Sequence, residues 1–278
     1  MSLFVFIAVL CAALLHASWN ALVKVGLNRF QTMLVLSIAQ GAMGVLMILA
    51  FPAPAREAWP FLLATGLVHT AYKLFLAAAY EHGDLSRVYP IARGAAPMMV
   101  ALMGLLILSD PVSPVQYIGI FLVGAGIMTM ARGIFTGGEA TKLLPLALAS
   151  AVCTATYSIL DGVGARLSLS PSAFTGWMFF LDGVFFATIA LFWKGKDTFK
   201  VPSKVWVSGS LAGALSLVSY WIVIWAMTEA PIQLVTALRE TSVLFATLIG
   251  IIWLKEKRDP SKLVAAALIV AGMVFMRL

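Results

Sequence analysis

Apolar runs of about 20 residues, separated by short polar breaks, follow one another along the whole chain. An α-helix needs about 20 apolar residues to cross the hydrocarbon core of a bilayer. Because the backbone in lipid must satisfy its own hydrogen bonds, helices are favoured over strands. The pattern predicts ten membrane-spanning helices, at residues 3–23, 32–52, 58–80, 88–108, 114–132, 142–164, 171–193, 204–228, 232–254 and 260–277.

The composition agrees with this pattern and excludes a water-soluble fold. Hydrophobic residues make up 62% of the chain and charged residues 11%, whereas soluble domains carry about 25% charged and under about 50% apolar residues. The net charge of +7 does not indicate nucleic acid as a partner, because most basic residues fall in short loops, where they meet lipid head groups. The predicted fold class is an all-α polytopic membrane protein in a lipid bilayer.

The chain also repeats itself after about 146 residues, a shift that brings several turn and helix residues into coincidence. These are Arg93 with Arg239, Gly104 with Gly250, Asp110 with Glu256, and Gly126 with Gly272. A slightly shorter shift aligns HASWN (16–20) with TATYS (154–158). Each copy has five helices, an odd number, so the second copy enters the membrane from the opposite side. We predict two inverted five-helix repeats, residues 1–138 and 139–278, an organisation typical of secondary transporters.

Four stretches resemble the drug/metabolite transporter superfamily, in particular proteins with two EamA-like domains. They are LLHASWNALVK, GDLSRVYPIARGAAP, LLILSDPVSPVQYIGIFLVGAGI and IIWLKEKRDPSKLVAAALIVAGM. Asp110 stands where the family pattern more often has Glu. The resemblance implies a ten-helix basket in which helices 1, 3, 4, 6, 8 and 9 line a central cavity. It implies that helices 2 and 7 lie outside and that helices 5 and 10 pack together. Members export amino acids, drugs, sugars and other metabolites, so the resemblance does not name a substrate.

Two arginines stand inside apolar runs, Arg93 and Arg239. A charge within a membrane span is costly and usually faces a cavity or a partner. Pro90 and Pro97 flank Arg93, and proline removes a backbone donor and loosens a helix. We predict that the arginines contact an anionic group, or act as gates, at the two ends of one cavity. The alternative is that both extend to the membrane interface. Glu240 either pairs locally with Arg239 or faces elsewhere.

Polar and aromatic side chains at helical spacing extend this candidate site. His69, Tyr72 and Lys73 fall at i, i+3 and i+4, which is one face of a helix. The alternatives are a hydrogen-bond cluster between helices and an aromatic belt at the interface. The remaining residues of the predicted substrate-binding set are His16, Trp19, Asn20, Tyr157, Tyr220, Trp221 and Glu240.

Two LDGV strings place acidic residues in helices, Asp161 and Asp182. Acidic groups in transporters can carry a coupling proton. Asp182 is deeper in its predicted helix and is the stronger candidate, while Asp161 stands near a predicted helix end. For Asp182, pairing with a basic neighbour is favoured over a proton relay.

These features predict a secondary transporter, an exporter of a small polar or amphipathic metabolite that carries a carboxylate or is zwitterionic. Protons are a candidate coupling partner. The alternatives are a membrane-embedded enzyme and a non-transporting sensor or scaffold. The chain has no Walker A, H-E-x-x-H or G-x-S-x-G motif, so we predict no enzyme activity, cofactor or metal site. With both halves in one chain, a monomer or weak dimer is expected.

The basic residues are distributed unevenly between the two sets of loops. Thirteen lie near the loops after helices 1, 3, 5, 7 and 9, and three, Arg56, Arg166 and Arg277, lie on the other side. Lys and Arg concentrate on the cytoplasmic side of membranes. The count therefore predicts both termini outside, in the inner membrane of a prokaryote, whereas many relatives are described with both termini inside.

Overall fold

The computed structural model describes residues 1–25, 29–81, 85–130, 140–252 and 260–278. These residues form helices joined by short turns, with no strand among them. The helices are α1 (Leu3–Val25), α2 (Arg29–Ala50), α3 (Trp59–Glu81), α4 (Leu85–Ile107), α5 (Pro114–Thr129), α6 (Ala140–Leu167), α7 (Pro171–Lys194), α8 (Ser203–Glu229), α9 (Ile232–Arg239), α10 (Ser242–Ile252) and α11 (Pro260–Arg277), with short 3-10 helices η1 (Arg56–Ala58) and η3 (Lys196–Phe199).

Every predicted segment corresponds to a helix, but the prediction of one continuous helix over 232–254 is wrong. The helix is interrupted at Glu240 and Thr241, which separate α9 from α10. The amide of Glu240 donates to the Ala237 carbonyl oxygen and that of Thr241 to the Leu238 carbonyl oxygen, both at 3.1 Å. These i to i−3 hydrogen bonds tighten the backbone into a turn of 3-10 type.

The helices have the length and surface of membrane spans. Among the described residues, six spans are long and apolar enough to cross a membrane: α1, α2, α6, α7, α8 and the α9–α10 unit. Shorter apolar stretches lie in α4 (91–107) and α5 (114–129). The protein is therefore an integral membrane protein.

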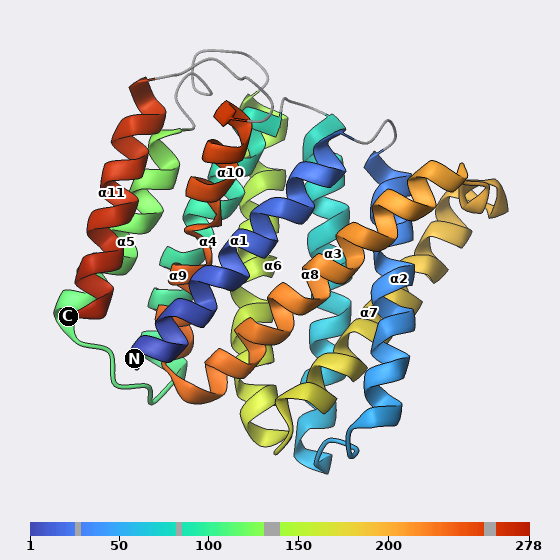
Figure 1. Cartoon of the computed structure of the whole chain (residues 1–278), viewed down its shortest axis with the longest axis horizontal. Helices are drawn as coiled ribbons and strands as arrows, with labels where there is room; N and C mark the ends of the chain where they lie inside the picture. Colours follow the sequence, from blue (N-terminus) through green and yellow to red (C-terminus); the bar gives the residue numbers. More distant parts are fainter. Residues whose placement is uncertain (26–28, 82–84, 131–139, 253–259) are drawn as a thin grey trace.

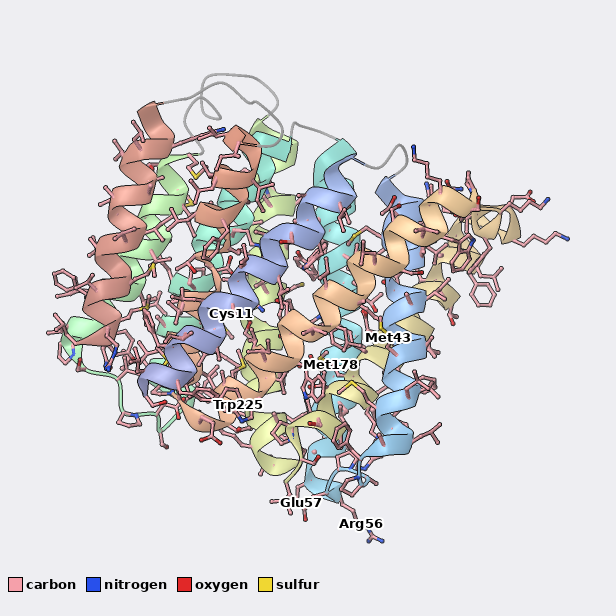
Figure 2. All side chains as sticks on the ribbon, viewed as in Figure 1. Cys11, Met43, Arg56, Glu57, Met178 and Trp225 are labelled. Carbon is pink, nitrogen blue, oxygen red and sulfur yellow. The ribbon has the colours of Figure 1, made fainter. Side chains whose placement is uncertain are left out.

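Large apolar side chains cover the outer surface of this bundle. Phe4, Leu106 and Phe192 are 72%, 85% and 84% exposed. Arg56 and Glu57, by contrast, project from the end of the bundle, in the turn between α2 and α3 (Figure 2). An apolar belt with charges at the ends is the surface expected of a protein in lipid.

Two helix pairs form the lateral edges of the bundle, at the left and the right in Figure 1. α5 packs along α11 at one edge, and α2 packs along α7 at the other. A Cβ at Gly119 would lie 2.7 Å from the Gly272 carbonyl oxygen, and one at Gly44 would lie 2.6 Å from that of Gly176. Small residues let helices approach closely in lipid. The predicted packing of the fifth predicted helix on the tenth is confirmed.

The helices between these pairs have pseudo-twofold symmetry. α1 packs against α8 as its counterpart α6 packs against α3, and α1 packs against α10 as α6 packs against α4. α1 and α6 run in opposite directions in Figure 1. Arg277 Nη1 donates to the Met1 carbonyl oxygen at 3.4 Å, so the two termini lie at the same face. This is the arrangement of an inverted repeat. The boundary predicted between residues 138 and 139 lies outside the described residues.

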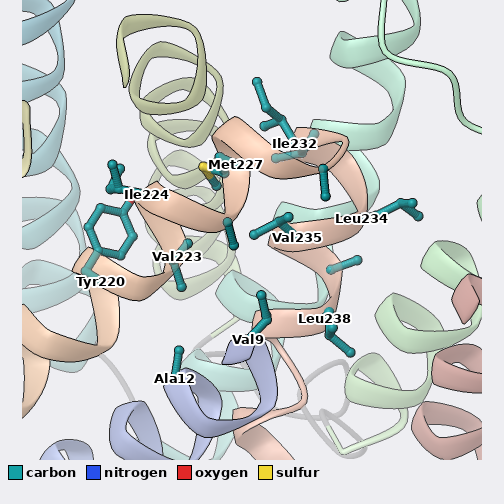
Figure 3. Packing of buried hydrophobic residues seen from close by; sticks show 14 of the residues in the cluster. Val9, Ala12, Tyr220, Val223, Ile224, Met227, Ile232, Leu234, Val235 and Leu238 are labelled. Carbon is teal, nitrogen blue, oxygen red and sulfur yellow. The ribbon is translucent and has the colours of Figure 1, made fainter. Parts of the chain in front are cut away.

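The short helix α9 is embedded in the bundle, and all of its residues are buried. It begins after Pro231, at a position where the missing N–H breaks no helical hydrogen bond. Figure 3 shows Ile232, Val235 and Leu238 of α9 together with Val223 and Met227 of the preceding helix, and all five belong to one buried apolar cluster. This apolar packing holds the end of α9, and with it Arg239, in the centre of the protein.

Candidate functional site

Two arginines from matching helices converge on one carboxylate oxygen. Arg93 Nη1, on α4, donates to Glu240 Oε1 at 3.0 Å, and Arg239 Nη2, at the end of α9, donates to the same oxygen at 3.1 Å. Arg93, Glu240 and Arg239 are only 3%, 0% and 1% exposed. Glu240 reaches both arginines because it stands in the turn between α9 and α10. The group therefore buries two positive charges against one negative charge, which is costly without further compensation.

His16 of α1 completes this arginine group. Its Nε2 is in contact with Arg93 Nη2, and its Nδ1 accepts a hydrogen bond from Trp19 Nε1 at 3.3 Å. Both neighbours are donors only, and a neutral imidazole accepts at only one ring nitrogen. His16 can therefore satisfy one of these two donors at a time.

A second polar group surrounds Asp161 of α6. Thr65 Oγ1 donates to Asp161 Oδ1 at 2.5 Å, Tyr220 Oη donates to Oδ2 at 2.5 Å, and His69 Nε2 lies 3.0 Å from Oδ2. The Tyr220 ring centroid lies 5.4 Å from Arg239 Cζ. Tyr220 of α8 therefore touches both polar groups, with its hydroxyl on one and its ring on the other.

Aromatic rings enclose the Asp161 group. The His69 ring stacks on Tyr157 with 4.0 Å between centroids, and Tyr157 makes edge contacts with Tyr72 and Tyr220 at 5.7 and 6.3 Å. Such contacts hold rings in defined orientations. The predicted residues His69, Tyr72, Tyr157 and Tyr220 are thus brought together with Asp161.

Lys73 and Asp182 form a separate pair. Lys73 Nζ donates to Asp182 Oδ2 at 2.5 Å and to Ser37 Oγ at 2.7 Å, which links α3, α7 and α2. Lys73 and His69 stand one turn apart on α3, yet they reach different helices. The favoured role of Asp182, pairing with a basic neighbour, is therefore observed.

Two residues of the predicted binding set make their contacts elsewhere. Asn20 Nδ2 donates to the His16 carbonyl oxygen of its own helix at 2.8 Å. Trp221 Nε1 donates to Ser172 Oγ at 2.9 Å, at the start of α7. Neither contact places the side chain in the arginine group or the Asp161 group.

Several sequence expectations need correction. Arg93 and Arg239 do not extend to the membrane interface, because both are buried in protein. They also meet at one Glu240 oxygen instead of standing at the two ends of a cavity. Asp161 is not near a helix end, since α6 continues to Leu167, and Asp161 is fully buried. Tertiary packing, which the hydropathy pattern does not contain, decides each of these positions.

Unmatched polar atoms gather on and beside α9. Among the described residues, Glu240 Oε2, Arg239 Nε and Thr236 Oγ1 are buried without a protein hydrogen-bond partner, as are both amide atoms of Gln233. Leaving such groups unsatisfied costs about 1–3 kcal/mol each. No group of three or more His, Cys, Asp or Glu side chains in the described part of the chain could hold a metal ion.

At the terminus face, Arg166 makes a half-buried ion pair that joins the two repeats. Its Nη1 and Nη2 donate to the two carboxylate oxygens of Asp110 at 2.7 and 3.1 Å. Its Nε and Nη2 also donate to the carbonyl oxygens of Met227 and Ala230, and Asp110 Oδ2 accepts from the Ile232 amide. This cluster ties the α4–α5 connection and the end of α6 to the α8–α9 turn.

Three of these interactions were not predicted from the sequence. Thr65 precedes His69 by four residues, so helical spacing could have added it to the face of α3. The sequence gives no comparable indication of the Ser37–Lys73 contact or of the Arg166–Asp110 pair, because the two residues in each contact are far apart along the chain. The counterpart of Asp110, Glu256, lies outside the described residues.

Comparisons with known proteins agree with this architecture. The model of the EamA-like transporter family matches residues 3–132 and 141–278. No curated protein matches the chain. A solved crystal structure of a protein matches with a TM-score of 0.76 over 99% of this chain and 96% of its own, at 18% sequence identity. That likeness concerns the fold alone.

Proposed function

From the premise that this chain belongs to the EamA-like transporter family, we propose that it exports a small zwitterionic or carboxylate-bearing metabolite by alternating access. Members of this family are membrane transporters and not enzymes. Export is taken from the resemblance to exporters of the drug/metabolite superfamily. A small-molecule substrate is the only partner the proposal requires.

The arginine group is the observation that carries the proposal. Arg239 Nε and Glu240 Oε2 are an unmatched donor and an unmatched acceptor on neighbouring residues, both buried. A guanidinium binds a carboxylate strongly through charge-assisted hydrogen bonds. An ammonium group on the same ligand would donate to Glu240 Oε2. A zwitterion therefore satisfies both atoms and also supplies an anion near two arginines that share one carboxylate.

The burial of these groups supports the proposal of alternating access. Arg93, Arg239 and Glu240 are almost inaccessible to solvent, so a ligand reaches them only if helices move apart. The turn between α9 and α10 offers a place for bending, next to the proposed contacts. The Arg166–Asp110 cluster holds the two repeats together at the terminus face and would have to separate when that face opens. Movement of one repeat against the other is the usual mechanism of inverted-repeat transporters.

The protein is proposed to lie in the cytoplasmic membrane of a prokaryote as a monomer or weak dimer, with both termini outside. The orientation rests on the thirteen basic residues near one set of loops against three on the terminus face. A reporter fused after Leu278 tests it. Activity of a reporter that works only in the cytoplasm would reverse the orientation.

The transport proposal is tested by flux into proteoliposomes of the purified full-length protein. The panel contains labelled amino acids, succinate as an anion and tetraphenylphosphonium as a cation. Amino acids should be transported, and Arg239→Gln should abolish their flux. Competition then tests the two contacts: for each transported amino acid, an analogue without the ammonium group or without the carboxylate should compete far less well than the intact compound.

A matched control removes an exposed charge. Lys200, which pairs with Asp197 at the membrane surface, is changed in Lys200→Gln, and this variant should transport as the wild type does. Transport of the cation alone, unaffected by Arg239→Gln, would refute the zwitterion proposal. Full competition by an analogue without an ammonium group would restrict the substrate to a simple carboxylate.

A further inference from the structure

The surroundings of Asp161 differ from those of the other buried carboxylates. Asp182 faces the ammonium group of Lys73, and Glu240 faces two guanidinium groups. Asp161 instead has Thr65, Tyr220 and His69 as hydrogen-bond partners. Hydroxyl and imidazole groups can each donate or accept a hydrogen bond, whereas ammonium and guanidinium groups only donate. The partners of Asp161 can therefore adapt to either protonation state.

The consequence of adding a proton also differs between the aspartates. A proton on Asp182 would leave the buried ammonium of Lys73 without its counter-charge, and an unpaired buried charge is strongly destabilising. A proton on Asp161 creates a neutral acid among neutral groups. This step removes a buried negative charge and isolates no positive one. The cost of protonation is therefore lower at Asp161, which reverses the order suggested by the sequence.

We infer that Asp161 is the proton-binding site of this protein and that Tyr220 links it to the arginine group. In the free state the carboxylate accepts from Thr65, Tyr220 and His69 Nε2. On binding, one proton enters at His69 Nδ1 while the Nε2 proton of His69 passes to Asp161 Oδ2, and the resulting O–H then donates to Nε2. One proton is gained in total, and release reverses the two transfers and returns one proton to water on the opposite side of the membrane.

Tyr220 provides the physical link between proton and substrate. Its hydroxyl is 2.5 Å from Asp161 Oδ2, while its ring lies against the Arg239 guanidinium. A charged carboxylate holds this hydroxyl more strongly than a neutral acid does. Protonation therefore weakens the hydrogen bond of the Tyr220 hydroxyl without breaking it, and this changes how the ring packs on Arg239. Tyr220 is a positioning residue, and the coupling it provides rests on the transport proposed above.

Among the described residues, the other buried or half-buried charged and tyrosine side chains on α6 and on the helices packed against it are engaged in separate contacts. They are Lys73 with Asp182, Arg93 and Arg239 with Glu240, Arg166 with Asp110, and Tyr72 and Tyr157 with neighbouring rings. Arg56 and Glu57 of η1 are exposed at the end of the bundle. Among these described groups, His69 and Tyr220 are the ones in direct contact with Asp161.

The test follows proton binding itself, in purified full-length protein, by infrared difference spectroscopy between alkaline and acidic pH. The wild type should gain a carboxylic acid C=O band on acidification, and Asp161→Asn should lose it. Thr154→Val is the matched control, because Thr154 is buried on the same helix but donates only to the Ser150 carbonyl oxygen. The band should persist in this control and in the charge-neutral double variant Lys73→Gln with Asp182→Asn.

Tyr220→Phe tests the positioning role of Tyr220 separately from proton binding at Asp161. The acid band should remain but shift in frequency, because the carboxyl group loses one hydrogen bond. A tyrosine with only a packing role would leave the frequency unchanged. Loss of the acid band in the Lys73–Asp182 double variant, or its persistence in Asp161→Asn, would overturn the assignment of the proton site.

Coupling is then measured with an amino acid that the flux panel selects. A pH gradient should drive its accumulation by the wild type and by Thr154→Val, while Asp161→Asn and Tyr220→Phe should no longer respond to the gradient. Accumulation driven by pH in Asp161→Asn would refute the coupling. If the panel shows no flux at all, the transport proposal fails, and the infrared result still decides whether Asp161 binds the proton.

Discussion

The fourth helix of the first repeat and its counterpart in the second place an arginine in the same group by different means. α4 continues through Arg93 and Pro97, whereas α9 ends at Arg239. Pro97 has no N–H to offer the Arg93 carbonyl, four residues earlier. In the second repeat the Val243 amide donates to the Glu240 carbonyl oxygen at 3.1 Å, in i to i−3 geometry. Both arginines therefore stand where the regular helical hydrogen bonding changes, through proline in one repeat and through a turn in the other.

The two repeats therefore share the position of the arginine, whereas the backbone around it differs between them. No proline or glycine occupies positions 239–242, so neither of the two strongest helix-breaking residues causes the break after α9. The turn instead places Glu240 between Arg93 and Arg239. We attribute the break to this buried charge arrangement.

Removal of the Glu240 charge should have the largest effect. Glu240→Gln leaves two buried guanidinium groups without their carboxylate, and breaking a buried ion pair costs about 3–5 kcal/mol. Thermal unfolding of the purified protein in detergent should show a large fall in Tm. Glu229→Gln is the control, because Glu229 is exposed at the end of α8. A Tm equal to that of this control would mean that the carboxylate does not hold the two repeats together.

Pro97→Ala should raise the stability of the protein and lower its amino-acid flux. Alanine restores an N–H for the Arg93 carbonyl, and an interior proline costs a helix about 3 kcal/mol. Stability should therefore rise by up to about that amount, while amino-acid flux falls because α4 becomes stiffer beside Arg93. Pro145→Ala in α6 is the matched control, since Pro145 also lies inside a helix. It should raise stability without lowering flux, and equal flux losses in both variants would remove any special role of Pro97.

Lysine substitutions should distinguish the roles of the two arginines. Arg239→Lys removes the Nε that has no partner among the described residues, so it should lower amino-acid flux about tenfold or more, the worth of one charge-assisted hydrogen bond. Arg93→Lys removes the planar group that contacts both Glu240 and His16, so it should lower Tm more than flux. Identical effects of the two variants on flux and Tm would show that the arginines are functionally equivalent.

Thr236→Val should have the smallest effect on stability. The buried Thr236 hydroxyl has no protein partner among the described residues, so replacing it with a methyl group breaks no hydrogen bond within the protein and should not lower the free energy of unfolding. Thr241→Val is the comparison across the break, because Thr241 Oγ1 donates to the Leu238 carbonyl oxygen at 2.7 Å. That variant should cost about 0.5–1.5 kcal/mol. A large loss of stability in Thr236→Val would indicate that ordered water satisfies the hydroxyl.

The helices and their order could be predicted from the sequence because hydropathy is a local property. Six of the described spans are long and apolar enough to cross a membrane, and the resemblance correctly implied that the fifth predicted helix packs on the tenth. The candidate site was predicted only in part. Arg93, Arg239 and His16 proved to be neighbours, whereas Asn20 and Trp221 point elsewhere, since a helical face can turn toward several partners.

By itself, the sequence determined that this protein is a helical membrane protein built from two inverted repeats. Length, hydropathy and an odd number of helices per repeat require this in lipid, where the backbone must bond within the chain. Which charged side chains contact one another is seen only in the folded protein. Glu240 is 147 residues from Arg93 along the chain, and Asp161 is 92 residues from His69. Such contacts depend on which faces of the helices pack together, which hydropathy does not specify, and they matter because an unpaired buried charge is strongly destabilising.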